Sequence, residues 1–283
     1  MIDARTGQTL QASHADSRRY PASLTKMMTL YLLFDAIDRG KVKPGTRMRV
    51  SRRAAQQPPT KLGLRFGQTI TVRNAILALA TKSANDVAVV VAEALAGTEW
   101  SFARQMNAKA RALGMKHTTF RNASGLHHPK QVTTARDMAR LGRALLRNHP
   151  RQSRVFATRS FQYHGNRYAN HNRLLGVYGG MDGIKTGYTN AAGYNLVGTA
   201  RRGKTRIIAV VLGQRSAAAR NTRMTALLNS GFRKAATVAK VAETKARTKA
   251  GTRVARWKPK ARDTISVERL PTPARRSTTA LGG

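Results

Sequence analysis

The 283-residue chain contains no cysteine, only 12 acidic residues and few aromatic side chains (6%). The absence of cysteine excludes thiol catalysis, disulfide bonds and cysteine–zinc sites. No apolar run approaches the roughly 20 residues that a membrane-spanning helix needs. The seven histidines have no paired carboxylates at metal-ligand spacing, so we expect neither a metal site nor a cofactor.

Positive charge dominates the composition, with 52 lysine and arginine residues and a net charge of +40. Residues 233–283 carry 14 basic and 3 acidic residues, a net of +11, which leaves +29 on residues 1–232. Such a surface attracts polyanions: nucleic acid, anionic lipid or an acidic wall polymer. It can also serve only to keep the protein soluble. Because no recognition motif is present, we expect no specific nucleic-acid binding.

Apolar periodicity and helix-capping residues predict a mixed architecture. Met1 to Leu10 has the pattern of two short strands around a Thr6-Gly7 turn rather than that of a secretory signal, so we expect a truncated first strand. Helices are expected over 24–39, 72–82, 87–96, from Thr98 to Leu113, from Thr134 to Asn148 and over 216–230, with Gly40, Gly97 and Gly231 as stops. Thr134 and Asp137 have the spacing of a capping box. Strands are expected over 155–163, 167–170, 181–184, 194–201 and 205–212.

Strands joined by hairpins between groups of helices indicate an α+β domain with an antiparallel sheet. Regular periodicity ends near Phe232, so we place a domain boundary after residue 232. Residues 235–250 have the composition of a frayed helix, and the rest of the tail that of a disordered segment.

Ser23 and Lys26 stand three residues apart at the start of the first predicted helix. At this spacing the two side chains share one helix face. A serine hydroxyl is a weak nucleophile until an adjacent base takes its proton, and lysine becomes that base if burial or a nearby cation lowers its pKa. The serine's own backbone N–H, at a helix start, is available to an oxyanion. No other serine in the chain has a lysine three residues later.

Two further segments carry polar residues where a cleft is expected. Ser83 and Asn85 lie in the turn between two predicted helices, where an ordinary helix cap is the simpler reading of either one alone. Lys185, Thr186 and Gly187 follow the predicted strand 181–184, and a glycine there allows a ligand backbone to come close.

The three segments in this order are typical of serine β-lactamases and penicillin-binding proteins. The flanking residues resemble the low-molecular-mass D-alanyl-D-alanine carboxypeptidases of peptidase family S11 over residues 1 to about 232. The resemblance is carried by Arg19-Tyr20-Pro21-Ala22-Ser23-Leu24-Thr25-Lys26-Met27-Met28-Thr29, Lys82-Ser83-Ala84-Asn85-Asp86, Asn122-Ala123-Ser124-Gly125-Leu126, Thr134-Ala135-Arg136-Asp137 and Asp182-Gly183-Ile184-Lys185-Thr186-Gly187-Tyr188-Thr189.

This resemblance implies a β-lactamase/transpeptidase-like fold, an antiparallel sheet with helices on both faces and an all-helical lobe bearing Ser83 and Asn85. It implies that Ser23 attacks the penultimate D-Ala of a peptidoglycan stem peptide and that Lys26 accepts its proton. Ser83 and Asn85 would relay protons and hold the acyl chain. It implies that Lys185 and Thr186, in the Lys185-Thr186-Gly187 motif, bind the terminal carboxylate of the substrate. The backbone N–H groups of Ser23 and Tyr188 would form the oxyanion hole. An arginine would also contact the substrate carboxylate, and Arg220 is the best match, with Arg215 and Arg223 as alternatives.

By the same resemblance, β-lactam antibiotics acylate Ser23 and the protein works in the periplasm or cell envelope, with the basic tail as a further contact to an anionic membrane or wall. Two departures stand out. Tyr188 replaces a histidine common in the family, and a basic tail follows where many relatives have a second domain and an anchor helix.

The alternatives are a β-lactamase, a basic nucleic-acid-binding protein and an inactive wall-binding homologue. The first needs a water-activating glutamate, but Asp137 is the sole acidic residue between Ser101 and Met181. The motif residues required for chemistry are all present, which disfavours the last.

Overall fold

The computed structural model describes residues 1–255, with side chains as far as 237. The chain divides into two units, Met1–Val238 and Ala239–Gly283. The helical elements are η1 (Ala22–Thr25), α1 (Lys26–Asp38), α2 (Arg52–Ala55), α3 (Val72–Ala80), α4 (Asn85–Ala96), α5 (Glu99–Ala112), α6 (Ala135–Asn148), η2 (Gln152–Ala157) and α7 (Ala217–Ala255). The strands are β1 (Ile2–Asp3), β2 (Arg47–Arg49), β3 (Thr69–Thr71), β4 (Ser160–Tyr163), β5 (Asn166–Ala169), β6 (Met181–Thr189), β7 (Gly193–Arg202) and β8 (Thr205–Gln214).

The central sheet is antiparallel, with the strand order β1-β8-β7-β6. The expected hairpin joins β7 to β8, with Arg202 opposite Thr205. β2 pairs with β3, and β4 with β5, in two small separate ribbons. The α+β class and its antiparallel sheet are therefore confirmed.

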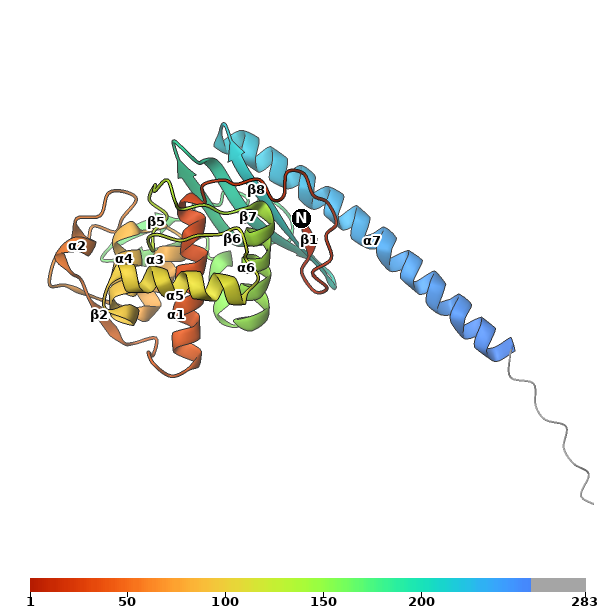
Figure 1. Ribbon diagram of the computed structural model, residues 1–283, viewed down its shortest axis with the longest axis horizontal. Helices are drawn as coiled ribbons and strands as arrows, with labels where there is room; N and C mark the ends of the chain where they lie inside the picture. The colour runs from red at the N-terminus through yellow and green to blue at the C-terminus, as the bar shows by residue number, and fades with distance from the viewer. Residues whose placement is uncertain (256–283) are drawn as a thin grey trace, which may run out of the picture. The chain divides into compact units, whose positions relative to one another are not determined.

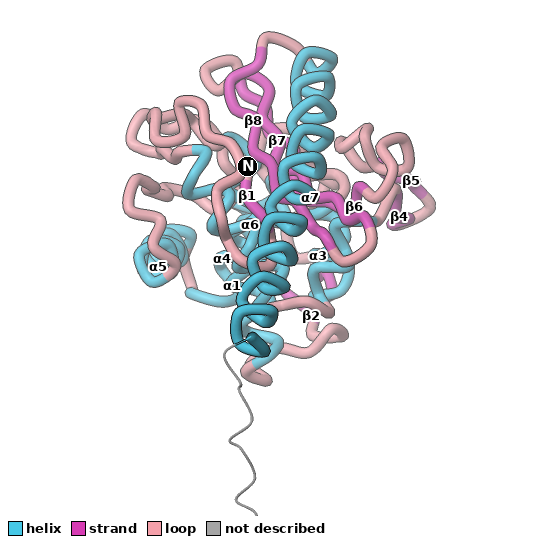
Figure 2. Tube along the Cα trace, turned by 90° about the vertical axis from the view of Figure 1, so that its right-hand side faces the viewer, coloured by secondary structure: helices cyan, strands magenta, loops and turns pink. Residues whose placement is uncertain are grey.

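Helices cover both faces of this sheet, because side chains alternate along each strand. Val197 of β7 belongs to the core shared with α1 and α6, whereas its neighbour Leu196 belongs to a second core with Met224 of α7. Figure 2 shows the first part of α7 in front of β6, β7 and β8, with α1 and α6 behind them. Glycine permits this close approach: a Cβ on Gly198 would lie 2.7 Å from the Met224 Sδ, and one on Gly142 would lie 3.2 Å from a methyl of β6.

A helical lobe built from α2, α3, α4 and α5 packs around α1 (Figure 1). Capping residues set where its helices begin: the side-chain oxygens of Thr71 and Thr98 accept the N–H of the residue three positions later. Thr134 caps α6 in the same way. None of the described helices is long and apolar enough to cross a bilayer.

Several predicted boundaries are wrong. Residues 155–157 belong to η2 rather than to a strand, and Thr9 forms only an isolated bridge to Ile2 rather than a second strand. Only one of the two hydrogen bonds of the expected Thr134–Asp137 capping box forms, the one from the Asp137 N–H to the Thr134 hydroxyl oxygen. The Asp137 carboxylate accepts from the His117 N–H and the Thr118 hydroxyl instead of returning to residue 134.

The last helix does not stop at Gly231 but continues to Ala255. A Cβ at Gly231 would lie 2.9 Å from the Met1 Sδ and 3.1 Å from Ile207, so this glycine serves close packing on the sheet rather than helix termination. A single glycine costs a helix only about 1 kcal/mol, and tertiary contacts offset it. The expectation of disorder at the end of the tail concerns residues 256–283, which lie outside the described residues.

Candidate active site

Ser23 and Lys26 lie where η1 passes into α1, so a turn of 3₁₀-helix precedes the expected α-helix. The Lys26 Nζ is 3.0 Å from the Ser23 Oγ. Ala22 has a positive φ of 48°, a conformation that non-glycine residues adopt only under constraint. Gly125 makes room for this conformation, because a Cβ there would lie 1.9 Å from the Ala22 carbonyl oxygen.

The Lys26 side chain is completely buried and has two further partners. Its Nζ donates to the Asn85 Oδ1 at 2.7 Å and to the Ser124 carbonyl at 2.6 Å. The Asn85 amide is oriented by its own donation to the Pro58 carbonyl, so its oxygen faces Lys26. Both oxygens can only accept. A neutral Lys26 would therefore direct its two N–H groups to them and its lone pair to the Ser23 hydroxyl.

Burial, reinforced by the nearby Lys185 ammonium, holds the pKa of Lys26 well below its usual range, and the Asp86 carboxylate opposes this only in part. The geometry and the charge environment thus both favour a neutral amine beside the serine. That is the state a general base requires.

Ser83 lies in the turn between α3 and α4, as expected, whereas Asn85 is already the first residue of α4. Ser83 has a positive φ of 62°, and the Thr60 hydroxyl donates to its carbonyl. Its own hydroxyl is buried and has no hydrogen-bond partner among the described residues. An unpaired buried hydroxyl is costly unless a ligand engages it.

Asp86 holds the loop that closes this side of the site. Its buried carboxylate accepts the backbone N–H groups of Leu62, Gly63 and Leu64. The same loop supplies the Pro58 carbonyl to Asn85 and places Pro59 and Thr60 in the cavity wall. Asp86 belongs to the Lys82–Asp86 segment that carries the family resemblance, but the sequence did not indicate that its carboxylate holds this loop.

Lys185, Thr186 and Gly187 lie inside β6, which continues to Thr189, and not at its end as the sequence indicated. Gly187 lines the cavity, so the expected approach of a ligand backbone stays a prediction, but the glycine is also needed for packing within the protein. A Cβ on Gly187 would lie 3.0 Å from the Pro21 carbonyl oxygen and 3.1 Å from the Ser23 nitrogen. Glycine therefore lets β6 lie against η1, which carries the serine.

Lys185 is buried, and its Nζ donates to the Thr186 carbonyl at 3.0 Å. Burial and the Arg220 guanidinium lower the pKa of Lys185 to about 7. Of the three candidate arginines, Arg220 is the one in the cavity wall. Arg215 is exposed, and Arg223 lines a separate groove together with residues of α6 and β8.

A cavity of about 380 Å³ collects these groups, with Ser23, Ser83, Asn85, Thr186 and Arg220 in its wall. His171 also lines it, and no sequence pattern had indicated this residue. Burial and the nearby lysines lower the pKa of His171 to about 4, so its ring is neutral near pH 7. Tyr188 is 49% exposed and packs against Tyr194, with ring centroids 4.3 Å apart.

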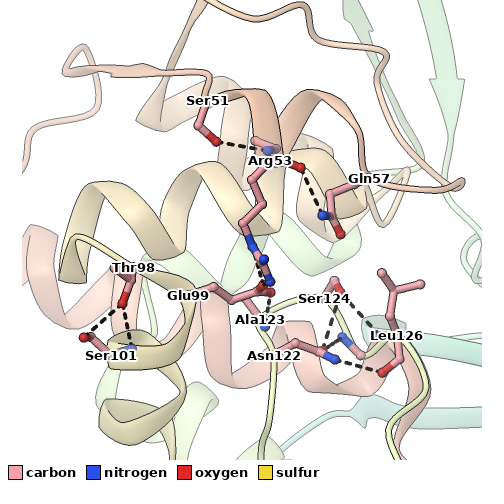
Figure 3. A network of polar contacts seen from close by, with 12 residues as sticks. Ser51, Arg53, Gln57, Thr98, Glu99, Ser101, Asn122, Ala123, Ser124 and Leu126 are labelled. Carbon is pink, nitrogen blue, oxygen red and sulfur yellow. Dashed lines mark hydrogen bonds and ion pairs between the residues drawn. The ribbon is translucent and has the colours of Figure 1, made fainter.

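The segment that carries Ser124 is held from two sides. The Thr29 hydroxyl of α1 donates to the Ala123 carbonyl at 2.7 Å. From α5, the Glu99 carboxylate accepts the Ala123 N–H and pairs with Arg53, as Figure 3 shows. Glu99 thereby helps to place the carbonyl to which Lys26 donates.

The arrangement can perform acyl transfer: a serine in the cavity wall is bonded to a buried base of lowered pKa, and the Arg220 guanidinium in the same wall can receive an anionic substrate. Seven of the nine site residues expected from the sequence line this cavity: Ser23, Ser83, Asn85, Thr186, Gly187, Tyr188 and Arg220. Lys26 is hydrogen-bonded to Ser23 and Asn85 of this lining, and Lys185 is buried beside Thr186. Among the described residues, no group of three or more His, Asp or Glu side chains is placed to hold a metal ion.

Comparison with known proteins yields matches over the same region. A family model described as D-alanyl-D-alanine carboxypeptidase (peptidase S11) matches residues 1–216. The chain is 36% identical over 237 residues to D-alanyl-D-alanine carboxypeptidase DacF of Bacillus subtilis, an alignment that covers 82% of this chain and 61% of DacF. It is 38% identical over 240 residues to DacA of Escherichia coli, covering 82% and 60%. The chain thus spans about three fifths of the length of these relatives.

Solved structures agree. Penicillin-binding protein 5 from Haemophilus influenzae superposes with a TM-score of 0.80 at 33% identity, covering 82% of this chain and 69% of that one. Penicillin-binding protein D2 from Listeria monocytogenes, in its ampicillin-bound form, superposes with a TM-score of 0.75 at 33% identity, covering 82% and 95%.

Proposed function

The chain belongs to the D-alanyl-D-alanine carboxypeptidase family, and from that premise we propose that it is a serine-type D-Ala-D-Ala carboxypeptidase. It removes the terminal D-Ala of peptidoglycan stem peptides through an acyl-enzyme on Ser23. β-Lactams acylate the same serine. The observation that carries the proposal is the buried Lys26 amine, 3.0 Å from the Ser23 hydroxyl and otherwise bonded only to acceptors.

In the proposed acylation the Ser23 Oγ attacks the carbonyl carbon of the penultimate D-Ala while its proton passes to the Lys26 Nζ. The oxyanion receives hydrogen bonds from the backbone N–H groups of Ser23 and Tyr188. The Ser23 N–H suits this role because it lies in the first turn of η1, where no intrahelical acceptor exists. The proton then passes to the leaving D-Ala amine by way of the Ser83 hydroxyl, which has no other partner among the described residues.

The same cavity suits a substrate that ends in a carboxylate. Lys185, Thr186 and Arg220 provide two buried cations and a hydroxyl on one side of Ser23. Asn85 stays available to the acyl chain through its amide. The residues that line the cavity in the described part of the chain include no aspartate or glutamate. This supports slow deacylation after β-lactam attack rather than a β-lactamase that activates water with a carboxylate.

The proposal is tested by the release of free D-alanine from a diacetyl-lysyl-D-Ala-D-Ala peptide, together with labelling by a fluorescent penicillin. We expect both reactions, with penicillin inhibiting D-alanine release as the label accumulates. A protein that takes up the label and loses it at once would be a β-lactamase. A folded protein that gives neither reaction would contradict the proposal.

The pKa of Lys185 predicts the alkaline limb of the pH profile. Its charged form, which holds the carboxylate, is disfavoured by burial, so in the free enzyme it is lost as pH rises through about 7. We expect kcat/KM for the peptide to fall towards about tenfold per pH unit above that point. In Lys185→Arg the guanidinium stays charged, and the limb should disappear. An unchanged limb in that variant would assign it to another group.

We also propose the organisation and surroundings of the protein. Residues 1–232 form the catalytic domain. Residues 233–283, with their net charge of +11, bind anionic membrane or wall surfaces in the periplasm or cell envelope. The support for this is the positive charge of the segment, and its contribution to vesicle binding can be measured by replacing its arginines.

A further inference from the structure

The helical lobe presents a second candidate binding surface, away from the serine. Residues 39–85 contain eleven lysine or arginine residues and no aspartate or glutamate. Four exposed arginines of this stretch gather around the β2–β3 ribbon and α2, together with an exposed phenylalanine. With a tryptophan of α5 they form what we call the aromatic–arginine surface: Arg47, Arg49, Arg52, Arg65, Phe66 and Trp100.

The ribbon turns its charged residues outward because its side chains alternate. Met48 and Ile70, which lie opposite each other, are buried in the core, whereas Arg47 and Arg49 on either side of Met48 are exposed. Backbone hydrogen bonds between Val50 and the chain at 67–68 extend the ribbon towards Phe66. The arginines therefore have a rigid backbone beneath them.

Contacts with α2 connect the two segments that carry the aromatic rings, and the Trp100 ring itself lies under Arg104 of α5, whose guanidinium is 4.9 Å from the ring centroid. Arg52 lies over the Phe66 ring at 5.1 Å. The next residue, Arg53, pairs at 2.6 Å with Glu99, the neighbour of Trp100 (Figure 3 shows this pair). Despite these contacts, Phe66 remains 55% exposed and Trp100 67% exposed. An exposed apolar patch with a polar rim commonly marks a protein- or membrane-binding site.

Charge and aromatic content together point to one kind of partner. Guanidinium groups bind lipid phosphates, while tryptophan and phenylalanine rings settle at the boundary between headgroups and acyl chains. A soluble polyanion that has no aromatic bases, such as polyphosphate, would use the arginines but would gain little from the two rings. The two carboxylates bonded next to this surface are both satisfied: Glu99 pairs with Arg53, and the buried Asp86 accepts the backbone N–H groups of residues 62–64.

We propose that the aromatic–arginine surface docks on an anionic lipid bilayer, with Phe66 and Trp100 entering the interface and the arginines contacting phosphate groups. The docked surface adjoins the loop 58–64, whose Pro59 and Thr60 line the catalytic cavity. Docking would hold that cavity near the bilayer without taking part in the chemistry. This contact is separate from the one proposed for residues 233–283.

Tryptophan fluorescence can test the proposal in the full chain. The sequence has two tryptophans, Trp100 and Trp257, so Trp257→Phe leaves Trp100 as the sole reporter. The probe is a vesicle of phosphatidylglycerol and phosphatidylcholine, with pure phosphatidylcholine for comparison. We expect Trp100 emission to move to shorter wavelength, and to be quenched by brominated acyl chains, only with the anionic vesicles.

Paired variants separate this surface from general charge. Arg49→Gln with Arg52→Gln should weaken vesicle binding by about fivefold for each arginine removed. Removing two exposed arginines elsewhere, by Arg147→Gln with Arg151→Gln, should weaken it less than twofold in total.

Phe66→Ala should weaken binding, whereas Val177→Ala, at a 78% exposed apolar residue outside the surface, should not. Penicillin labelling and the melting temperature report that each variant is folded.

The tail's share is measured by replacing Arg262, Arg269, Arg275 and Arg276 with glutamine. This variant should bind more weakly but show the full Trp100 shift at saturating lipid. The proposal is overturned if Trp100 does not respond at saturation, or if the surface variants bind as the control variants do. It is also overturned if soluble polyphosphate binds as tightly as vesicles with no contribution from Phe66, because the surface would then recognise polyanions in general.

Discussion

Ser23→Ala protein is expected to show no covalent penicillin adduct and no release of D-alanine above background. Removing the nucleophile of an acyl-transfer site costs about 10⁶-fold in rate when the remaining residues cannot replace it. Here no neighbouring residue can take over as nucleophile, because Lys26 would face only the methyl group of the alanine and Ser83 lies in a different segment of the chain. The measurement is intact mass after incubation with benzylpenicillin, which should rise by one adduct in the unsubstituted protein.

Ser101→Ala is the matched control. Ser101 also lies at a helix start and has a basic residue, Arg104, three positions later, but its hydroxyl bonds to Thr98 rather than to a buried amine. It should acylate normally. Peptide mapping of the adduct completes the test, since an adduct on Ser83 would refute the assignment of Ser23.

Lys26→Arg is expected to lower acylation by at least the factor of about 10²–10⁴ that a general base contributes, whereas Lys185→Arg should retain part of it. A guanidinium keeps its protons at any workable pH and so cannot accept the serine proton. It is also too large for a side chain that is fully buried among the Ser23 Oγ, the Asn85 Oδ1 and the Ser124 carbonyl. At Lys185 the proposed task needs only a positive charge, which arginine preserves. Second-order rate constants for penicillin labelling below pH 7 would show the difference.

Lys82→Arg serves as the control for this pair, because its ammonium lies 5.6 Å from the Tyr168 ring centroid rather than beside the serine. It should react normally. Equal and complete loss in Lys26→Arg and Lys185→Arg, with melting temperatures unchanged, would contradict the separate roles of the two lysines.

The regular helices followed from local sequence, because their signals act over a few residues. Thr98 and Thr134 cap α5 and α6 as expected, each accepting the N–H three positions later. The elements between residues 47 and 71 did not follow in this way. β2 and β3 are three residues each, and their pairing joins Arg47 to Thr71 across a long loop, which local propensity does not encode.

Gly231 illustrates how one residue type can mislead. A glycine after an apolar helical stretch indicates a helix end, yet α7 continues through it. The deciding contacts are with Met1 and Ile207, at the other end of the chain and in β8. Gly187 is similar: the sequence indicated a close approach there, but only the fold showed that η1 comes close to it.

What the sequence determined about this protein is its chemistry: a serine with a lysine on the same helix face, and two further polar segments in a characteristic order. The tertiary structure decided which state and which partners those residues have. It buries Lys26 beside Lys185 and so lowers its pKa, and it sets Asn85 and the Ser124 carbonyl to orient its lone pair. Of the three candidate arginines, it places Arg220 in the cavity wall. These properties depend on burial and on contacts between residues far apart in the chain, which spacing along a single segment does not specify.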